Sequence, residues 1–406
     1  MKQSMNKPMN KPMNKKKSQP MSQQNDQETN QPMNQPMNQP TGSDNLNRLN
    51  FTKDQTLIAK GLFIILLLSH HLFYFNNLET YHIKTIIQDE NFLNYLFFFC
   101  KICVGGFVFL SAYGITLIFM SQKENCGTGT YFSIMINRLL KLLFSFWPVF
   151  FLALIAQQFM GQKNVMDFYR SEGYFRPLYM VFDGLGLSKY FQTPTLNITW
   201  WYLTLAIILI ILMPLIYMLV KKFGWLVFIP AFFILPYMLD QDYDLGYLIP
   251  TMILGTICAK DNLLNRLRNL GQGRKLMKAA KAGISIVLVI ISFQIMITLN
   301  AVTYCYALTS FLFVYISFEF LSCIPVLNVV MKRIGKNASN IFFTHTFIYY
   351  YYFSKFIFSF QYDLLILLAL LLSSLLLSEA IELMKKIVQY QTLVNKVLGA
   401  VNKHIS

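Results

Sequence analysis

Residues 57–75, LIAKGLFIILLLSHHLFYF, form an apolar stretch long enough to cross a lipid bilayer as one helix. A spanning helix needs about 20 mostly apolar residues, because a hydrocarbon core about 30 Å thick is crossed at about 1.5 Å per residue. Lys60 lies near one end of this stretch, and the adjacent His70 and His71 lie near the other. An ionisable side chain at membrane depth costs free energy, so these residues are candidates for function.

Similar apolar runs recur along the chain. Hydrophobic residues make up 55% of its 406 residues, charged residues only 13%, and the mean hydropathy is +0.42. This composition excludes an ordinary soluble domain and is typical of a multi-pass membrane protein. We expect an all-α, polytopic transmembrane helical bundle of about ten spans. Their expected limits are 57–75, 95–120, 139–160, 200–220, 224–239, 245–260, 281–299, 302–324, 340–360 and 363–384.

The formal net charge of +16 could indicate nucleic-acid binding, but most Lys and Arg residues lie in short segments between the apolar runs. With the N-terminus inside and ten spans, these segments fall on the cytoplasmic side, as the positive-inside rule requires. We therefore expect both termini in the cytoplasm, contact of these charges with the lipid bilayer, and no nucleic-acid partner.

The composition divides the chain into three parts. Residues 1–50 repeat KPMN and QPMN and have too little apolar content to fold, so they predict a disordered cytoplasmic tail. Residues 52–385 form the transmembrane domain, and 386–406 form a short cytoplasmic segment. The six cysteines lie mostly in apolar runs and are expected to be packing residues, including the Cys100-x-x-Cys103 pair. The acidic run at 240–244 lacks the glycine and glutamate of a calcium loop, so we expect no bound metal.

One outer loop, residues 161–199, is much longer than the other connections. It carries charged residues among aromatic ones, and long loops in compact proteins are commonly functional. It is either a site for a polar acceptor or a solvated connector. Its charged residues include Asp167, Arg170, Glu172, Arg176 and Asp183.

Lys60 and His71 share one face of the first helix. Eleven residues separate them, which places them about 16 Å apart along the axis and about 20° apart around it. His70 is turned about 100° away from that face. Lys60 would lie near the inner surface and His71 in the outer half of the membrane. A lone histidine on an apolar helix is more often a packed residue than a reactive one.

Other polar residues in the apolar runs also have ordinary explanations. Ser111 and Tyr113 lie in a stretch of small residues in the second span, where hydroxyls bond across helix interfaces. Arg138 and Lys141 are one turn apart at the inner start of the third span, where cations snorkel to the interface or bind phosphate. Trp201 lies at the outer interface, where aromatic residues are common.

These stretches, in this order, resemble the acyltransferase-3 family of integral-membrane O-acyltransferases. The resemblance covers about residues 52–385. It departs from the family pattern at Ala112, in place of glycine, and at Lys141, in place of arginine. The matching elements are Lys60-Gly61 followed by nine residues and His71, Phe107–Tyr113, Arg138-x-x-Lys141, Trp201-Tyr202-Leu203, Gly255 and Phe342–His345.

The resemblance implies an enzyme that transfers an acyl group, usually acetyl, from acyl-CoA on the cytosolic side. The acceptor would be a hydroxyl of an exported or cell-envelope glycan, and the location a cell membrane, with a bacterial plasma membrane expected. Acyl-CoA would be a co-substrate, and no bound cofactor is expected. A transporter or flippase for a polar lipid or lipid-linked sugar is the alternative, with His71 as a proton relay. Dependence on coenzyme A separates the two.

Acyl transfer to a hydroxyl requires a base for the acceptor proton. We expect His71 to be that base or a transient acyl carrier. Lys60, Arg138 and Lys141 would bind or orient the coenzyme A donor. Supporting roles are open to Ser111, Tyr113, Trp201, Glu319 and His345.

The last two of these residues carry specific expectations. Glu319 is expected to pair with Arg138 or Lys141. His345 is expected near the coenzyme A entrance or in ordinary packing. Measured from the cytoplasmic ends of straight helices it lies about 13 Å from the depth of His71, too far for a direct hydrogen bond, so we do not expect it to be a partner of His71.

Overall fold

A computed structural model of the chain describes residues 51–74, 77–122, 128–239, 245–299 and 302–405. The chain divides into two units, Met1–Asn45 and Leu46–Ser406. The first unit lies outside the described residues, and so do the expected disordered tail and the acidic run at 240–244. The described helices and strands belong to the second unit.

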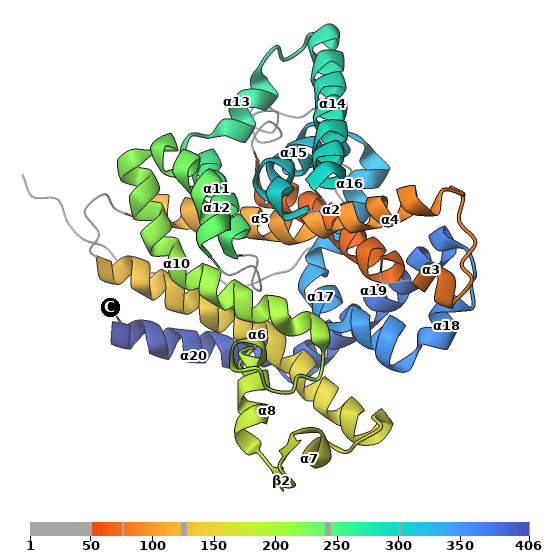
Figure 1. The fold of residues 1–406 in the computed structure, drawn as a ribbon. Coiled ribbons are helices and arrows are strands. Elements are labelled where there is room, and N and C mark those ends of the chain that lie inside the picture. The colour runs from red at the N-terminus through yellow and green to blue at the C-terminus, as the bar shows by residue number, and fades with distance from the viewer. Residues whose placement is uncertain (1–50, 75–76, 123–127, 240–244, 300–301, 406) are drawn as a thin grey trace, which may run out of the picture. The chain divides into compact units, whose positions relative to one another are not determined.

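The second unit is built almost entirely of helices (Figure 1). The long or strongly apolar helices are α2 (Lys53–Phe73), α4 (Glu90–Phe99), α5 (Cys103–Met120), α6 (Thr128–Met160), α10 (Trp201–Phe223), α11 (Trp225–Met238), α12 (Leu245–Lys260), α14 (Lys275–Leu299), α15 (Tyr306–Glu319) and α19 (Asp363–Ile387). The shorter ones that matter below are α3 (Asn77–Thr80), α13 (Leu263–Asn269), α16 (Pro325–Lys336), α17 (Ala338–Thr346), α18 (Ser354–Phe358) and α20 (Tyr390–Ile405). Single 3-10 turns lie at Cys100–Ile102, Val302–Cys305 and Leu321–Cys323. The expected all-α class is confirmed.

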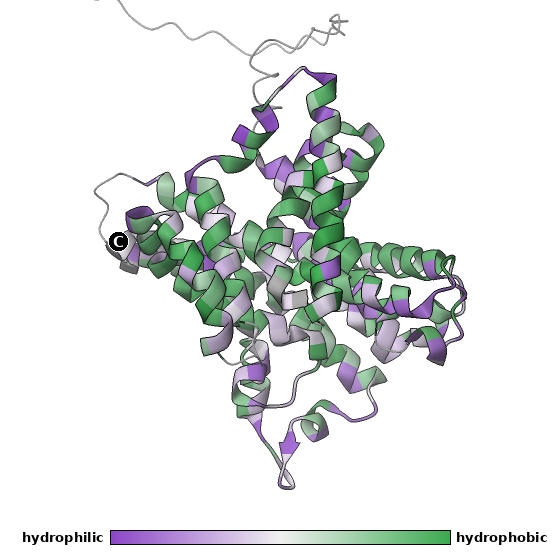
Figure 2. Ribbon diagram, turned by 45° about the horizontal axis from the view of Figure 1, so that its top comes forward, coloured by the Kyte–Doolittle hydropathy of each residue, from purple (hydrophilic) through white to green (hydrophobic). Residues whose placement is uncertain are grey.

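Among the described residues, seven helices are long and apolar enough to cross a membrane. They lie within or overlap seven of the ten expected spans, and Figure 2 shows apolar residues along them. Two further expected spans correspond to the shorter apolar helices α11 and α12. The seven are Lys53–Phe73, Glu90–Met120, Gly129–Met160, Ile198–Phe223, Lys275–Leu299, Tyr306–Cys323 and Asp363–Ile387.

The remaining expected span, residues 340–360, is not one continuous α-helix. It consists of α17, a π-helical stretch at Phe347–Tyr352 and the five-residue α18. Two donors from another segment, the Trp200 indole N–H and the Asn197 amide, bind the carbonyl oxygen of Phe343 in α17. π-helical stretches are rare and occur frequently at functional sites. This interruption lies directly after His345.

Helices α2 and α16 cross closely because both carry glycine at the contact. A methyl group added to Gly61 would overlap the backbone of Met331, and one added to Gly335 would overlap the backbone of Leu57. Small residues permit this kind of helix approach in membrane proteins. The crossing also brings Lys332 to Asp54, with Nζ and Oδ2 2.6 Å apart. Gly61, which follows Lys60, thus has a packing role of its own.

The segment 161–199, expected as a long outer loop, has its own folded structure. It contains α7 (Val165–Phe168), the two-stranded antiparallel hairpin of β1 (Arg170–Ser171) and β2 (Tyr174–Phe175), α8 (Pro177–Gly184), α9 (Ser188–Phe191) and the 3-10 helix η2 (Ile198–Trp200). Glu172 and Gly173, both at positive φ, form the hairpin turn. At the other end of the chain, α20 lies along α6 (Figure 1), where Tyr390 donates a hydrogen bond to the carbonyl of Phe144.

Candidate functional site

His71 lies against a second histidine, His345. The two imidazole ring centroids are 5.1 Å apart, with the ring planes inclined by 44°. His71 is half-buried near the end of α2, and His345 is completely buried near the end of α17. The expected depth difference of about 13 Å between these residues was therefore wrong.

The depth estimate failed because it took both helices as straight and measured each from the membrane boundary. Helix α17 instead follows α16, whose Gly335 contacts Leu57 of α2. Counted from that shared contact, His71 is about 21 Å and His345 about 15 Å further along, at about 1.5 Å per residue. The crossing of α16 therefore places α17 deeper in the bundle than its sequence position suggests.

Hydrogen bonds to α19 fix α17 in this position. The Asn340 amide donates to Ser378 Oγ at 3.1 Å and to Glu382 Oε1 at 2.9 Å. Ser378 in turn donates to the Asn337 side chain at 2.7 Å. Buried polar groups in such networks restrict a helix to one register, because any shift leaves them without partners. The hydrogen bonds between α17 and α19 thus fix the position of His345.

His70, the neighbour of His71, has a structural role. Its Nδ1 lies 2.8 Å from the carbonyl oxygen of Phe97, so Nδ1 carries the hydrogen of this bond. The ring is buried and stacks on Tyr74 with centroids 5.0 Å apart. His70 therefore joins α2 to α4, which agrees with its expected orientation away from the Lys60 face.

Lys60 and Arg138 form a positively charged region at the other end of α2. Both side chains are half-buried and close enough for their charges to repel, and Lys141, one turn beyond Arg138, is exposed. Within the described residues, no carboxylate forms an ion pair with any of the three. Uncompensated cations near one another are suited to binding an anion.

Glu319 does not pair with Arg138 or Lys141. It is buried at the end of α15, and Lys281 Nζ of α14 lies 3.3 Å from its Oε1. Lys281 also donates to the carbonyl of Arg268, whose guanidinium stacks on Phe318. The expectation for Glu319 was wrong because α14 and α15, consecutive along the chain, pack together. This cluster joins three neighbouring helices.

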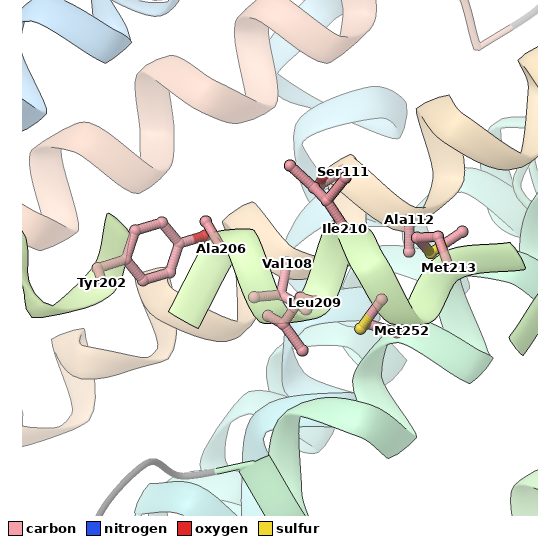
Figure 3. A pocket seen from close by; sticks show the side chains of 9 residues that line it. All are labelled: Val108, Ser111, Ala112, Tyr202, Ala206, Leu209, Ile210, Met213 and Met252. Carbon is pink, nitrogen blue, oxygen red and sulfur yellow. The ribbon is translucent and has the colours of Figure 1, made fainter. Parts of the chain in front are cut away.

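Ser111 contributes to a small, mostly apolar pocket between α5, α10 and α12 (Figure 3). The pocket contains about 260 Å³ of non-atom space, and Tyr202 lies at one end of it. Trp201, the preceding residue, packs partly buried against the main core. Tyr113 is buried with its ring edge-on to Phe51, 5.1 Å between centroids. These contacts give Tyr113 a packing role.

Three polar residues near the histidine pair were not singled out by the sequence. Thr346 lies beside His345, and its hydroxyl oxygen is 3.1 Å from that of Thr199. Thr199 donates to the side chain of Asn197, which is completely buried. The sequence did contain a signal for Thr346. The polar run Thr344–Thr346 interrupts an apolar segment, and Thr346 directly follows the histidine to which its hydroxyl bonds.

In the outer segment, Asp183 is a structural residue. It is almost completely buried and accepts hydrogen bonds from the Tyr169 hydroxyl at 2.7 Å, the Ser188 hydroxyl at 3.0 Å and the Leu196 N–H at 2.9 Å. Burial raises the pKa of Asp183 above 3.8, against the lowering effect of these bonds, and also raises the pKa of Tyr169. Asp183 thus holds together the two ends of the segment.

Replacing Asp183 with asparagine should open this segment. One carboxylate oxygen becomes an N–H donor. Either the Tyr169 hydroxyl and the Leu196 N–H, which share Oδ2, or the Ser188 hydroxyl, which bonds to Oδ1, then loses its acceptor. The cost is about 1–3 kcal/mol for each buried donor. We expect faster limited proteolysis between residues 161 and 199 of the full-length protein in detergent. The control is Asp167→Asn, which alters only solvent-accessible contacts, the ion pair with Arg170 and a hydrogen bond from the Asn164 amide, and should cleave at the wild-type rate.

The same experiment has a pH dependence. Because the folded segment binds the Asp183 proton more tightly than the opened segment, the stabilisation is fully present below pH 3.8 and is lost as pH rises through the raised pKa. The wild-type segment should therefore resist cleavage better as the pH falls toward that range. In Asp183→Asn the slower cleavage at low pH should disappear. If cleavage of Asp183→Asn still slows as the pH falls, another titrating group causes the effect.

The described part of the chain is thus an α-helical membrane-type domain with a pair of histidines in contact at the end of its first helix. Residues 58–382 match the family model described as an acyltransferase domain, and the chain belongs to this family, acyltransferase-3. Neither a curated protein nor a solved structure matches it. The expected family membership is confirmed, and it makes the protein a membrane acyltransferase.

Proposed function

We propose that the protein transfers an acyl group, acetyl in the simplest case, from cytosolic acyl-CoA to a hydroxyl of an exported or cell-envelope glycan. One observation carries this proposal. The uninterrupted helix α2 has Lys60 toward one end, with Arg138 of α6 close enough for their charges to repel, and the His71–His345 contact at the other. An anionic donor and a neutral hydroxyl acceptor would need such separate surroundings.

This function requires a defined orientation in the membrane. We propose about ten spans, with α11, α12 and the interrupted segment from α17 to α18 completing the seven long helices. Both termini would be cytoplasmic, in a bacterial plasma membrane. The clustering of Lys and Arg in the segments assigned to the inside supports this orientation. Lys60 then faces the cytosol and His71 the outer half.

The chemistry at His71 follows from the needs of ester formation. The neutral imidazole of His71 accepts the proton of the acceptor hydroxyl. At the same time the hydroxyl oxygen attacks the thioester carbonyl carbon. The new C–O bond forms as the C–S bond breaks, and the departing thiolate takes the proton from His71 to give free coenzyme A. In the second route, His71 first attacks the thioester and carries the acyl group to the hydroxyl. Both routes require an unprotonated His71 nitrogen.

The donor would bind at the Lys60–Arg138–Lys141 region. Coenzyme A carries several phosphates, and Arg binds phosphate through paired N–H groups. The extended pantetheine arm would then reach along α2 toward His71. The acceptor would approach from the segment 161–199 and from Trp200 and Trp201. No metal is needed for this reaction.

Removing a donor-side cation should weaken binding of the donor. For Arg138→Gln we expect the KM for acetyl-CoA to rise by about tenfold or more, because a charge-assisted hydrogen bond contributes about 1.5–3 kcal/mol. Lys141→Gln should act in the same direction with a smaller effect, since Lys141 is exposed. The turnover number should change little in both. Steady-state kinetics with reconstituted protein measures these values.

Two controls make this test specific. Lys278→Gln removes an exposed cation of α14 and should leave KM unchanged. With acetyl-pantetheine, which lacks the nucleotide phosphates, Arg138→Gln and wild type should behave alike. If KM for acetyl-CoA is the same in Arg138→Gln, Lys141→Gln and wild type, the donor does not bind in this region.

The transfer function itself is tested by acceptor-dependent release of coenzyme A thiol. Membranes containing the protein should release thiol from acetyl-CoA when envelope glycans are added, and the glycans should gain alkali-labile acetyl esters. Membranes without the protein should do neither. Movement of a lipid-linked sugar without consumption of any acyl-CoA would instead favour a transporter or flippase.

A further inference from the structure

The buried histidine His345 is fixed in one tautomer. Its Nδ1 lies 3.1 Å from the carbonyl oxygen of Ile341 and 2.9 Å from that of Phe342. Carbonyl oxygens only accept hydrogen bonds, so Nδ1 carries a hydrogen. The lone pair of the neutral ring is therefore on Nε2.

The Nε2 atom of His345 meets the hydroxyl of Thr346, 3.3 Å away. An unprotonated nitrogen accepts, so the Thr346 hydroxyl must donate its hydrogen to Nε2. The Thr346 oxygen also lies 3.1 Å from that of Thr199, whose own hydrogen is donated to Asn197 Oδ1 at 2.8 Å. Each hydroxyl has one hydrogen to give, so the Thr346 hydrogen is shared between His345 Nε2 and the Thr199 oxygen.

The Thr199 end of this series of hydrogen bonds lies in the 3-10 helix η2, the last element of the outer segment. Asn197 Oδ1 accepts from the Thr199 N–H at 2.9 Å, and the Asn197 amide lies 3.4 Å from the carbonyl of Phe343. The Trp200 indole N–H binds the same carbonyl at 3.1 Å. The side chains of Asn197, Thr199, Trp200 and Thr346 are all buried. The outer segment is thus joined rigidly to the helix that carries His345.

We propose that His345 is a positioning residue for His71, and that the Thr346 hydroxyl, which also meets Thr199 of the outer segment, holds it in place. The inference rests on the acyl transfer proposed above. A neutral ring held 5.1 Å from His71 limits the orientations of the His71 ring. It also presents no positive charge to oppose the one that forms when His71 takes the acceptor proton. Catalytic bases are commonly oriented by such a third group.

The chain offers closely matched variants for the test. Thr346→Val keeps the shape of the side chain and removes the hydroxyl, whereas Thr346→Ser keeps the hydroxyl. Thr344→Val is the control for a lost hydroxyl, since Thr344 is buried on the same helix but donates only to the carbonyl of Asn340, within α17. Steady-state kinetics of reconstituted full-length proteins, with folding checked by thermal unfolding, compares them.

We expect Thr346→Val to lower the turnover number by about ten- to hundredfold, as loss of an orienting partner commonly does. The KM for acetyl-CoA should stay within about twofold, because the donor cations are at the other end of α2. Thr346→Ser should recover most of the rate, and Thr344→Val should resemble wild type.

Two results would overturn the inference while the proposed function stands. In one, the wild type transfers acyl groups, His71→Ala does not, and Thr346→Val matches Thr344→Val. In the other, Thr346→Ser is as slow as Thr346→Val, which would mean that the hydroxyl is not what matters. A wild type that transfers no acyl group would overturn both the proposed function and this inference.

Discussion

Replacing His71 with alanine is expected to lower the rate of acyl transfer by at least about 100-fold, since a positioned general base contributes about 10²–10⁴-fold. If His71 carries the acyl group, the loss should be complete. The protein should still fold, because the side chain is half-buried and the helix α2 is held by other contacts. The rate is measured as labelled acetate transferred to glycan at saturating acetyl-CoA.

The adjacent histidine provides the control for this experiment. His70→Asn places an amide N–H where Nδ1 of His70 bonds to the Phe97 carbonyl, so it keeps the link between α2 and α4. Its rate should remain within a few-fold of wild type. If His70→Asn loses activity and His71→Ala keeps it, the two histidines have been assigned the wrong roles.

Replacing Gly335 with alanine should destabilise the whole domain. The added methyl would lie 2.7 Å from the backbone carbonyl carbon of Leu57, closer than such atoms approach, and a backbone atom cannot move aside as a side chain can. The helices α2 and α16 would have to separate, at a cost of about 3 kcal/mol or more. We expect a large fall in the midpoint of thermal unfolding in detergent.

Gly114→Ala is the matched control, because no atom lies within 4 Å of the position where its methyl would be. It should be neutral or stabilising by up to about 1 kcal/mol, the helix-propensity gain of alanine over glycine. Equal unfolding midpoints for Gly335→Ala and Gly114→Ala would mean that the α2–α16 crossing is not as close as described. Gly335→Ala should also lower activity, since α16 sets the position of α17 and His345.

The sequence predicted the long helices well, because each is a continuous apolar run bounded by charged residues. Residues 57–75, 281–299 and 363–384 were expected, and the helices are Lys53–Phe73, Lys275–Leu299 and Asp363–Ile387. The interruption between α17 and α18 could not be predicted from periodicity. It depends on donors from Asn197 and Trp200, which are about 150 residues away in the chain.

The histidine contact was missed for a related reason. Depth counted along straight helices is reliable only when every helix starts at the membrane boundary, and α17 starts within the bundle after the crossing of α16. Glu319 shows a different error, because its partner Lys281 lies on the preceding helix, and consecutive helices are usually neighbours. His71 was singled out from the sequence as a candidate, because few ionisable side chains occur within an apolar run.

In the proposed reaction, His71 passes an acyl group from a cytosolic donor to an acceptor on the other side of the membrane. Sealed inside-out vesicles from cells that express the protein, given labelled acetyl-CoA from outside, test it directly. We expect alkali-labile label on glycans enclosed in the lumen with wild type and none with His71→Ala. Label confined to acceptors on the acetyl-CoA side, or equal lumenal label in the two proteins, would contradict it.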